Sequence, residues 1–381
     1  MRASNSCTLV VPTMSRPFLI KDIAHQAGVS VATVDRVLNN RPNVRAHMAR
    51  RVEQAIDALQ RQRRQVGVVG RKFLLDLVMD TPQRFSNAVR TALELEMSTL
   101  RPSIFRARDE LHEAWPVGEL VATLDRIAAR GSHGVLLKAP NLPVVVDAVG
   151  RLVDRGIPVI TLVTDLPSSR RLAYVGLDNR AAGETAAYLL GQWLQPGPRV
   201  GVLVSMSSAY FRGEEEREVG FRAVLRSTRD DVSVHTISEG QGVEERTTGL
   251  VQAQLRRHPH IAAVYSIGGA NEAICRAFDQ MARPCRCFIG HDLDEDNLAL
   301  LRAGRLHAVL DHDLRHDMRQ ACLRILAAHG AGGDAGSPGL SNVDVMTSFN
   351  LPASLRGDAH DRQPRLMPHQ QAPSHVASGC R

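Results

Sequence analysis

The first patterned stretch of the chain places apolar residues at helical spacing and ends at a glycine. Ile20, Ile23, Ala24 and Ala27 recur at intervals that put them on one face of a helix. Gly28 follows directly, where a chain that turns back on itself needs a residue tolerant of positive φ. The pattern therefore predicts a short helix followed by a tight turn.

A second helix is predicted immediately after this turn. Ser30 suits its N-cap, because a serine hydroxyl accepts a hydrogen bond from the backbone of the first turn. Its buried stripe is predicted to be Val34, Val37 and Leu38, and ARRVEQAIDAL at 49–59 predicts a third helix. Two helices joined by a short turn, the second with its first turns exposed, are the geometry of a helix-turn-helix that reads the DNA major groove.

From Phe73 onward, short apolar runs alternate with amphipathic stretches. The apolar runs predict buried strands, and they are FLLDLVMD, HGVLLKA, IPVITLVT, RVGVLVSM, IAAVYSIGG and RCFIGHD. The stretches between them predict helices, among them VATLDRIAAR, VVVDAVGRLVDRG, RAAGETAAYLLGQWL and VGFRAVLRST. Buried strands separated by such helices indicate an α/β fold with doubly wound parallel sheets. Ligands bind beyond the carboxyl ends of strands in these sheets, so residues that follow a strand are candidates for a site.

Positive charge is concentrated at the start of the chain. Residues 1–72 contain 13 Lys and Arg against 4 Asp and Glu, a net of +9, whereas the whole chain is +7 and the remainder is therefore near −2. A basic head on a nearly neutral body indicates one nucleic-acid-binding module attached to a sensing domain. The length of 381 residues suits this division, and 44% hydrophobic with only 4% aromatic residues predicts an aliphatic core.

The predicted head offers two kinds of DNA contact. The start of its second helix faces the bases, whereas Arg41, Arg45, Arg50 and Arg51 face phosphates, which position the helix without reading sequence. Asp35 is unusual on such a surface: it accepts from a cytosine amino group or pairs with a neighbouring arginine, and the sequence leaves both open. The predicted DNA contacts are Ser30, Val31, Ala32, Thr33, Asp35, Arg36, Asn39, Arg41, Arg45 and Arg50.

The sequence of this head resembles the N-terminal domain of the LacI/GalR family of bacterial repressors. The resemblance is carried by VSVATVDRVLNN, with IKDIAHQAG before it and ARRVEQAIDAL after it, and it extends through Leu59. It departs from the family at Asp35, where a serine is usual. The resemblance implies a homodimer that binds double-stranded DNA at a pseudo-palindromic operator.

The linker departs further from that family, which usually continues with Tyr-x-Pro-Asn and a short helix whose leucine wedges into the minor groove. Here the segment reads QRQRRQVGVVGRKF, with an arginine pair at 63–64 in place of Pro-Asn and Gly70 at the leucine position, one turn after Gly67. Each glycine costs a helix interior about 1 kcal/mol relative to alanine, so a hinge helix is expected to be weak. Val66 or Val69 can still insert between bases, and the linker arginines can contact phosphates instead.

The body resembles the periplasmic ribose-type sugar-binding proteins and their repressor counterparts, from about Phe73 to Pro352 and most clearly from Gly156 on. The matching segments are VGLDNRAAGETAAYLL, EREVGFRAVL, GGANEAI, FIGHDLDED and GRLHAVLDHDLRHD. This resemblance implies a two-lobed, type I periplasmic-binding-protein-like domain, joined by three crossings, with a small polar ligand held between the lobes.

Transferred position by position, the resemblance assigns ligand contacts in the later segments. Arg217 corresponds to an arginine on sugar hydroxyls or the ring oxygen, Asn271 to an amide ligand, and Asp292 to a carboxylate after a strand. His312 stands where a glutamine is more usual, so the identity of the ligand is expected to differ. The acidic run 294–296 is interpreted as a solvated loop.

Three residues that follow earlier strands complete the predicted effector site. Asp165 offers an acceptor for a pair of hydroxyls, Arg84 a polar group and Phe85 an aromatic platform. A sugar needs rigid carboxylates and amides, an arginine and an apolar surface for its ring face. The predicted effector contacts are Arg84, Phe85, Asp165, Arg217, Asn271, Asp292 and His312.

The predicted boundaries are a leader at 1–15, the helix-turn-helix head at 16–60, a linker at 61–72, the effector-binding body at 73–353 and a tail at 354–381. The first lobe is expected to comprise about 73–176 and 307–335, and the second about 177–306 and 340–353. The leader precedes the family-like SRPFLIKDIA and is expected to be an overextended gene start. The tail lacks apolar periodicity and is expected to be disordered.

Other classes of function lack support in the sequence. No GxGxxG opens a helix, and the P-loop and GxSxG patterns are absent, so neither an enzyme nor a cofactor is expected. The 15 histidines are dispersed, and His312, Asp313 and His316 lack a convincing further ligand, so no metal site is predicted. There is no run of about 18 uncharged apolar residues and no secretory signal, and the six scattered cysteines are expected to be reduced thiols.

The sequence thus predicts a cytoplasmic, homodimeric, ligand-responsive transcription regulator, in the first instance a repressor that responds to a sugar or polyol. One alternative is an activator or global regulator that responds to a sugar phosphate or another polar ligand, for which Arg212 and Arg217 leave room. Another is a solute-binding protein or sugar-handling enzyme in which the head is incidental. The basic head and the lack of a signal peptide disfavour this last alternative.

Overall fold

The computed structural model describes residues 18–39, 41–42, 44–66, 70–195, 199–240, 242–331 and 339–356. It divides into two compact units, a helical head and an α/β body that begins at Lys72. The expected leader, Gly67 and Val69 of the linker, and the tail from 357 onward lie outside the described residues. None of the helices in the described ranges is long and apolar enough to cross a membrane.

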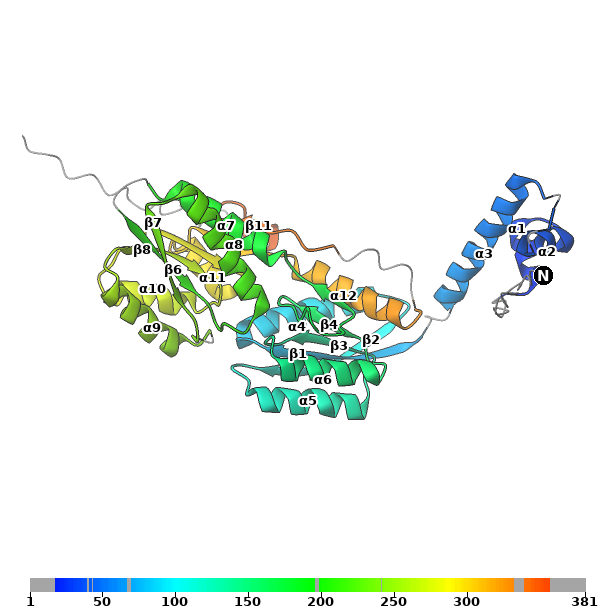
Figure 1. Ribbon diagram of the computed structural model, residues 1–381, viewed down its shortest axis with the longest axis horizontal. Helices are drawn as coiled ribbons and strands as arrows, with labels where there is room; N and C mark the ends of the chain where they lie inside the picture. Colours follow the sequence, from blue (N-terminus) through cyan, green and yellow to red (C-terminus); the bar gives the residue numbers. More distant parts are fainter. Residues whose placement is uncertain are drawn as a thin grey trace, which may run out of the picture. The chain divides into compact units, whose positions relative to one another are not determined.

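The head is a three-helix unit made of α1 (Ile20–Ala27), α2 (Val31–Leu38) and α3 (Ala46–Val66) (Figure 1). Gly28 ends α1 with a left-handed φ of 59°. Ser30 caps α2, because its Oγ accepts a hydrogen bond from the Thr33 N–H at 3.1 Å. A small apolar core holds the three helices together, with Val34 and Val52 fully buried at its centre. The turn and the cap are thus those that the sequence predicts.

The linker begins as a continuation of α3, which runs as one helix through Val66. Gly70 has a φ of 73°, outside the range of a right-handed helix. The position that holds the wedging leucine in the resembled family is therefore not helical in this chain.

The first sheet of the body has five parallel strands in the order β2-β1-β3-β4-β5. Helices α5 and α6 pack on one face of this sheet, and α4 and α12 lie together on the other (Figure 1). Its elements are β1 (Lys72–Asp80), α4 (Gln83–Thr99), β2 (Ile104–His112), α5 (Val117–Arg130), β3 (Gly134–Lys138), α6 (Pro143–Asp154), β4 (Val159–Leu162), β5 (Ala173–Val175) and α12 (Leu314–Ala328).

The second sheet has six strands in the order β11-β10-β9-β8-β6-β7. All of them are parallel except the edge strand β11, which is the last strand in the sequence. Apolar clusters cover both faces, one beneath α7 and α8 and the other beneath α9, α10 and α11 (Figure 1). Its elements are α7 (Asn179–Trp193), β6 (Val200–Ser205), α8 (Arg212–Thr228), β7 (Val232–Ile237), α9 (Glu244–Arg257), β8 (Ile261–Ser266), α10 (Asn271–Gln280), β9 (Cys287–His291), α11 (Glu295–Arg302), β10 (Ala308–Asp311) and β11 (Asp344–Met346), with a short 3₁₀ turn at Ala353–Leu355.

The predicted strands are all present, and each lies in the interior of its sheet. The sequence missed β10, which is interior to the second sheet, and the edge strands β2, β5, β7 and β11. Most side chains of β2 and β7 are only half-buried or exposed, so they lack the apolar run that marks a strand buried on both faces. The α/β fold class with parallel sheets is confirmed.

The chain passes between the two lobes after β5, after β10 and again between α12 and β11. One predicted boundary is wrong here, because the first-lobe segment was expected to start at 307. Residues 308–311 instead form β10, which pairs in parallel with β9 in the second sheet. The apolar side chains of β10 are fully buried in that sheet, so the crossing follows the strand rather than preceding it.

Helices α7 and α8 of the second lobe approach each other through glycines. A Cβ added to Gly183 would lie 1.9 Å from the backbone oxygen of Arg217, and one added to Gly220 would lie 2.4 Å from that of Arg180. These glycines allow the two backbones to touch. The packing fixes the part of α8 from which Arg217 projects.

Candidate functional site

The body contains a pocket of about 240 Å³ between the carboxyl ends of the strands of the two sheets. This is the place where ligands bind in open α/β sheets. Its charged and aromatic lining comes from both lobes. The first lobe contributes Asp80, Arg84, Phe85, Trp115 and Lys138, and the second contributes Tyr210, Phe211, Glu214, Arg217, Glu239, His291, Asp292 and Asp294.

The first-lobe side of the pocket is built around a buried lysine at the end of β3. The Nζ of Lys138 donates to the Asp80 backbone oxygen at 3.0 Å and lies 4.1 Å from the centre of the Phe211 ring. Burial lowers the pKa of Lys138, although the nearby Glu214, Asp80 and Asp292 oppose this shift. Burial likewise raises the pKa of Asp80, whose carboxylate accepts from the Trp115 N–H at 3.0 Å.

Arg217 is held at the second-lobe side by the crossing between the lobes. Its Nε donates to the Asn179 side-chain oxygen at 2.8 Å, and Asn179 in turn donates to the Val163 oxygen at 3.1 Å. Val163 has a φ of 64°, which turns its carbonyl group toward this asparagine. One turn before Arg217, Glu214 accepts from both the backbone N–H and the hydroxyl of Ser207. Arg217 thus lines the pocket from a position fixed by two backbone segments.

His291 and Asp292, at the end of β9, present unpaired polar atoms. The Nε2 of His291 lies 2.8 Å from the Tyr265 hydroxyl, whereas its Nδ1 has no hydrogen-bond partner among the described residues. Oδ1 of Asp292 is also buried without such a partner, and Asp292 has a φ of 64°. A buried unpaired acceptor costs about 1–3 kcal/mol. Both residues line the pocket, so a ligand that donates to Asp292 and forms a hydrogen bond with Nδ1 of His291 would remove this cost.

Two predicted contacts, His312 and Asn271, lie behind the pocket rather than in its lining. His312 is buried, with Nδ1 2.7 Å from Asp317 and Nε2 3.8 Å from Asp292. Burial lowers the pKa of His312, but the hydrogen bond and charge of Asp317 and the charges of Asp292 and Asp311 outweigh it and raise the pKa overall. Asn271 donates to Asn297, a pocket residue, at 2.7 Å. In this structure they support lining residues, and direct contact of either side chain with a ligand stays a prediction.

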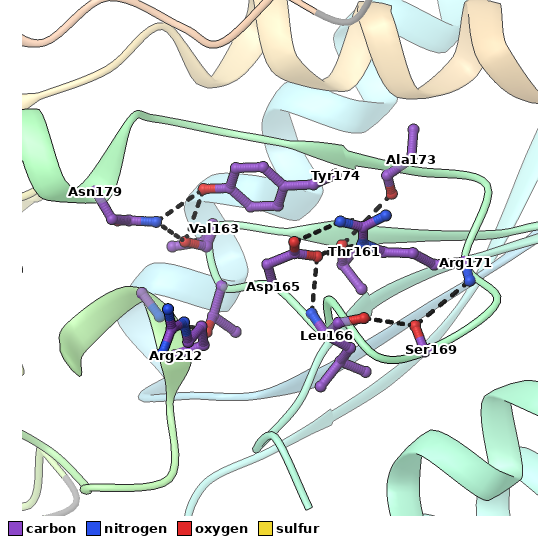
Figure 2. A network of polar contacts seen from close by, with 12 residues as sticks. Thr161, Val163, Asp165, Leu166, Ser169, Arg171, Ala173, Tyr174, Asn179 and Arg212 are labelled. Atoms are coloured by element: carbon purple, nitrogen blue, oxygen red, sulfur yellow. Dashed lines mark hydrogen bonds and ion pairs between the residues drawn. The ribbon is translucent and has the colours of Figure 1, made fainter. Parts of the chain in front are cut away.

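Asp165 is a clearer correction, because its carboxylate is already occupied. Arg171 pairs with both of its oxygens, the Thr161 hydroxyl donates to it at 2.8 Å and the Leu166 N–H at 2.7 Å (Figure 2). Burial raises the pKa of Asp165, but these four donors outweigh burial and lower it. Asp165 is absent from the pocket lining. Its role is to hold the loop between β4 and β5.

Arg84 and Phe85, at the start of α4, lie in the pocket where the sequence places them. The Nε of Arg84 is 3.0 Å from the Asp294 carboxylate, so this ion pair links the two lobes across the pocket. A second link is the Asn141 N–H, which donates to the Tyr210 oxygen at 2.8 Å. Asp294 was expected in a solvated loop, but its side chain is only 9% exposed, caps α11 and lines the pocket. Burial raises its pKa to about 6, against the opposing effect of Arg84.

Several pocket residues were missed by the sequence reasoning, notably Asp80, Lys138, Trp115, Glu214 and His291. Two of them carried a signal: Asp80 and Lys138 are charged residues that end predicted apolar strands, where ligands bind. Trp115 had none, because it follows the edge strand β2 that the sequence did not reveal.

The head presents its predicted base-reading residues on an accessible surface. The start of α2 is exposed, with Val31 at 53% exposure, and Arg36, Arg41, Arg45 and Arg50 are also exposed. Asp35 accepts from the Asn39 amide at 2.7 Å and lies 3.2 Å from an Arg41 nitrogen. Of the two alternatives for Asp35, the structure therefore contains the pair with a neighbouring arginine. Contact of these residues with DNA stays a prediction.

Two family models match the chain. Residues 19–60 match the bacterial regulatory proteins of the lacI family, and residues 111–334 match the periplasmic binding protein domain. The HTH-type transcriptional regulator reg1 of Streptomyces lividans is 27% identical over 270 residues, which are 67% of each chain.

Solved structures are similar to the body. The glucose-galactose binding protein GanP of Geobacillus stearothermophilus has a TM-score of 0.65 at 20% identity and covers 74% of this chain and 99% of its own. An ABC transporter solute binding protein of Agrobacterium vitis, bound with alpha-D-tagatopyranose, has a TM-score of 0.64 at 17% identity and covers 73% of this chain and 95% of its own. At these identities the similarity shows the fold. The chain carries a lacI-type DNA-binding head, and by the match that spans more than half of its length it belongs to the family of the periplasmic binding protein domain.

Proposed function

We propose that this regulator is a cytoplasmic repressor that is released from DNA by a sugar or polyol bound in the pocket of the body. The observation that carries the proposal is the composition of that pocket. A ring nitrogen of His291 and a carboxylate oxygen of Asp292, both without a hydrogen-bond partner among the described residues, lie in the same lining as the buried Arg217 and the aromatic Phe85 and Trp115. Hydroxyl groups donate and accept, and the face of a sugar ring packs on aromatic side chains.

The size and charge of the pocket favour a neutral ligand as small as a monosaccharide. Its volume of about 240 Å³ is below the roughly 300 Å³ at which drug-sized ligand sites begin. Five acidic residues accompany three basic ones in its lining: Asp80, Glu214, Glu239, Asp292 and Asp294 against Arg84, Lys138 and Arg217. This balance disfavours a phosphate dianion, which needs clustered cations or free backbone N–H groups. The solved structures that share this fold include sugar-binding proteins, which supports a sugar as the ligand class.

In this proposal, the protein is a homodimer whose two heads bind a pseudo-palindromic operator. The supporting observation is the exposed start of α2 with basic residues beside it. Ligand bound between the lobes would favour their closed arrangement, to which the ion pair of Arg84 and Asp294 across the pocket would contribute. Binding of DNA and of ligand would then be coupled, so each changes the affinity for the other by the same factor.

The first test is a thermal-shift panel of pentoses, hexoses, polyols and their phosphates on the purified full-length protein. A ligand at 100 times its dissociation constant adds about 2.7 kcal/mol of stability, which raises the midpoint measurably. A hit among neutral sugars supports the proposal, and its addition should lower the affinity for the protein's own promoter region. No preference for that promoter over random DNA at moderate salt would refute the DNA-binding part.

Arg217→Ala should remove the response to such a ligand and leave DNA affinity nearly unchanged. Arg217 lines the pocket, and loss of a charged hydrogen-bond donor costs about 1.5–3 kcal/mol per bond. The matched control is Arg226→Ala, which removes an exposed arginine of the same helix. Fluorescence anisotropy of operator DNA, with and without ligand, measures both effects. Equal loss of DNA and ligand binding would mean that Arg217 supports the fold instead.

The alternative is an activator or global regulator that responds to a sugar phosphate. The sequence left room for it through Arg212, but the structure pairs Arg212 with Glu215 and Glu216 at 3.1 and 2.8 Å, and Arg212 is not part of the pocket lining. A thermal-shift response to phosphorylated sugars and not to the neutral ones would favour this alternative.

A further inference from the structure

Three histidines that are far from the pocket residues converge at the edge of the second sheet. His235 lies in the edge strand β7, His258 is the C-cap of α9, and His260 stands just before β8. Each is half-buried, and each offers a ring nitrogen within 4.8 Å of the others. His258 and His260 precede the amino end of β8. The pocket lies at the opposite, carboxyl end, where the residues that follow β8 line it. The cluster is therefore separate from the effector site.

The spacing of the nitrogens is close to that around a tetrahedral ion. The Nε2 atoms of His235 and His260 are 3.1 Å apart, and the Ser233 hydroxyl lies 3.2 and 3.1 Å from them. Two nitrogens on one tetrahedral zinc ion lie about 3.4 Å apart, because each is about 2.0–2.1 Å from the metal. The His258 ring lies against His235, with 3.9 Å between the ring centroids and 30° between the ring planes. A rotation of the His258 ring would point its nitrogen toward the same ion as the third ligand.

The backbone around the cluster holds two of the three rings in place. His235 is anchored by the ladder between β7 and β6, where it is paired with Leu203. The His260 oxygen accepts from the Gly201 N–H at 2.9 Å, and a Cβ at Gly201 would come within 2.9 Å of the His260 ring. Gly201 thus leaves the space into which this ring packs. The donor atoms are presented largely by fixed strands rather than by loose loops.

The charges around the cluster favour the neutral imidazole, which is the form that binds a metal. Burial, followed by the charges of His258, His260, Arg199 and Arg222, lowers the pKa of His235 to about 4. Burial, His258, Arg199 and Arg283 also lower the pKa of His260. The same arginines would repel a cation, although Arg222 is offset by Glu218 at 2.7 Å. Three nitrogen donors without a carboxylate therefore suit zinc or a neighbouring transition metal, and not magnesium or calcium.

We propose that His235, His258 and His260 form a binding site for one zinc ion per chain, with the Ser233 hydroxyl or a water molecule in the fourth position. The ion would tie the edge strand β7 to the turn between α9 and β8. The site would stabilise the second lobe independently of the effector pocket. The three histidines are spread over 26 positions of the sequence, and the pairing of the strands brings them together.

The test is a zinc titration of untagged, chelator-treated full-length protein in competition with a fluorescent zinc chelator. We expect one ion per chain and a higher thermal midpoint with zinc. Cobalt should give the intense visible absorption of a tetrahedral site. His260→Ala and His258→Ala should each weaken zinc binding by more than tenfold, because loss of even an outer partner of a metal ligand costs about 10–100-fold. His316→Ala, which removes an exposed histidine of α12, is the matched control and should bind as the wild type does.

Two results would overturn the proposal: zinc affinity in the cluster variants equal to that of His316→Ala, or a stoichiometry of one ion per two chains. His260 packs against β6, so its variant can lose stability for reasons unrelated to zinc. His258 lies at the end of a helix, and its variant keeps the test decisive if circular dichroism shows a folded, zinc-free protein.

Discussion

The loop after β4 in the first lobe and the loop after β9 in the second are built alike. Each contains a residue with a φ of 64°, Val163 in one and Asp292 in the other, and each carries an aspartate near the end of its strand. Asp165 is bound by Arg171, Thr161 and the Leu166 backbone, whereas Asp292 retains a buried oxygen without a hydrogen bond. An acid that follows a strand is thus a ligand candidate only if its own loop leaves it unsatisfied.

The largest effect expected from this contrast is on ligand affinity. Asp292→Asn should weaken binding of the effector by about 100-fold, because each hydrogen bond to a charged acceptor contributes about 1.5–3 kcal/mol. Asparagine tolerates positive φ, so the backbone at this position should be retained. Isothermal titration with the ligand found in the panel measures the loss. An unchanged affinity would show that the unpaired oxygen of Asp292 does not meet the ligand.

Asp165→Asn should show the opposite behaviour, a loss of stability with little change in affinity. Breaking its pair with Arg171, in which both side chains are about one-fifth exposed, should lower the free energy of unfolding by about 1–3 kcal/mol. Because the folded-state pKa of Asp165 is lowered, its contribution is present above the unfolded pKa and is lost as pH falls through the folded value. Denaturant melts should therefore show a larger difference in the free energy of unfolding between wild type and variant at pH 7 than below pH 4. A ligand affinity reduced as strongly as in Asp292→Asn would remove the contrast.

The smallest effect is expected at Asp294, whose pair with Arg84 links the two lobes. Its folded-state pKa of about 6 lies above the ordinary 3.8, so it favours the fold below pH 4 and loses that effect as pH rises through 6. Asp294→Asn, which keeps a helix-capping side chain, should match the wild type near pH 4 and be more stable by up to about 2 kcal/mol at pH 7.5. Thermal melts across this range measure the gap. A variant that is less stable at pH 7.5 would mean that the link to Arg84 outweighs the burial of the charge.

The head, most of the central strands and part of the site follow from local sequence patterns. The spacing of Ile23, Ala27 and Val34, with Gly28 and Ser30 at the turn, predicts the helix-turn-helix without reference to the body. Most strands that are buried on both faces can be recognised in the sequence as apolar runs. Arg84, Phe85, Arg217 and Asp292 lie in the pocket that was expected for them. Their contact with a ligand stays a prediction.

Other features depend on partners that no local pattern reveals. The edge strands β2 and β7 carry polar side chains because one side of each has no neighbouring strand. Trp115 enters the pocket only through β2, and His235 meets His260 only because β7 lies beside β6.

The sequence by itself determined the helix-turn-helix, most of the central strands and which family the head resembles, because hydrophobic periodicity and turn chemistry act over a few residues. The tertiary structure alone decided that Asp165 is bound by Arg171 while Asp292 is open, and that Asp294 lines the pocket with a buried side chain. The reason is that the availability of a polar side chain depends on its burial and on its partners. Both are set only when separate loops and strands pack together.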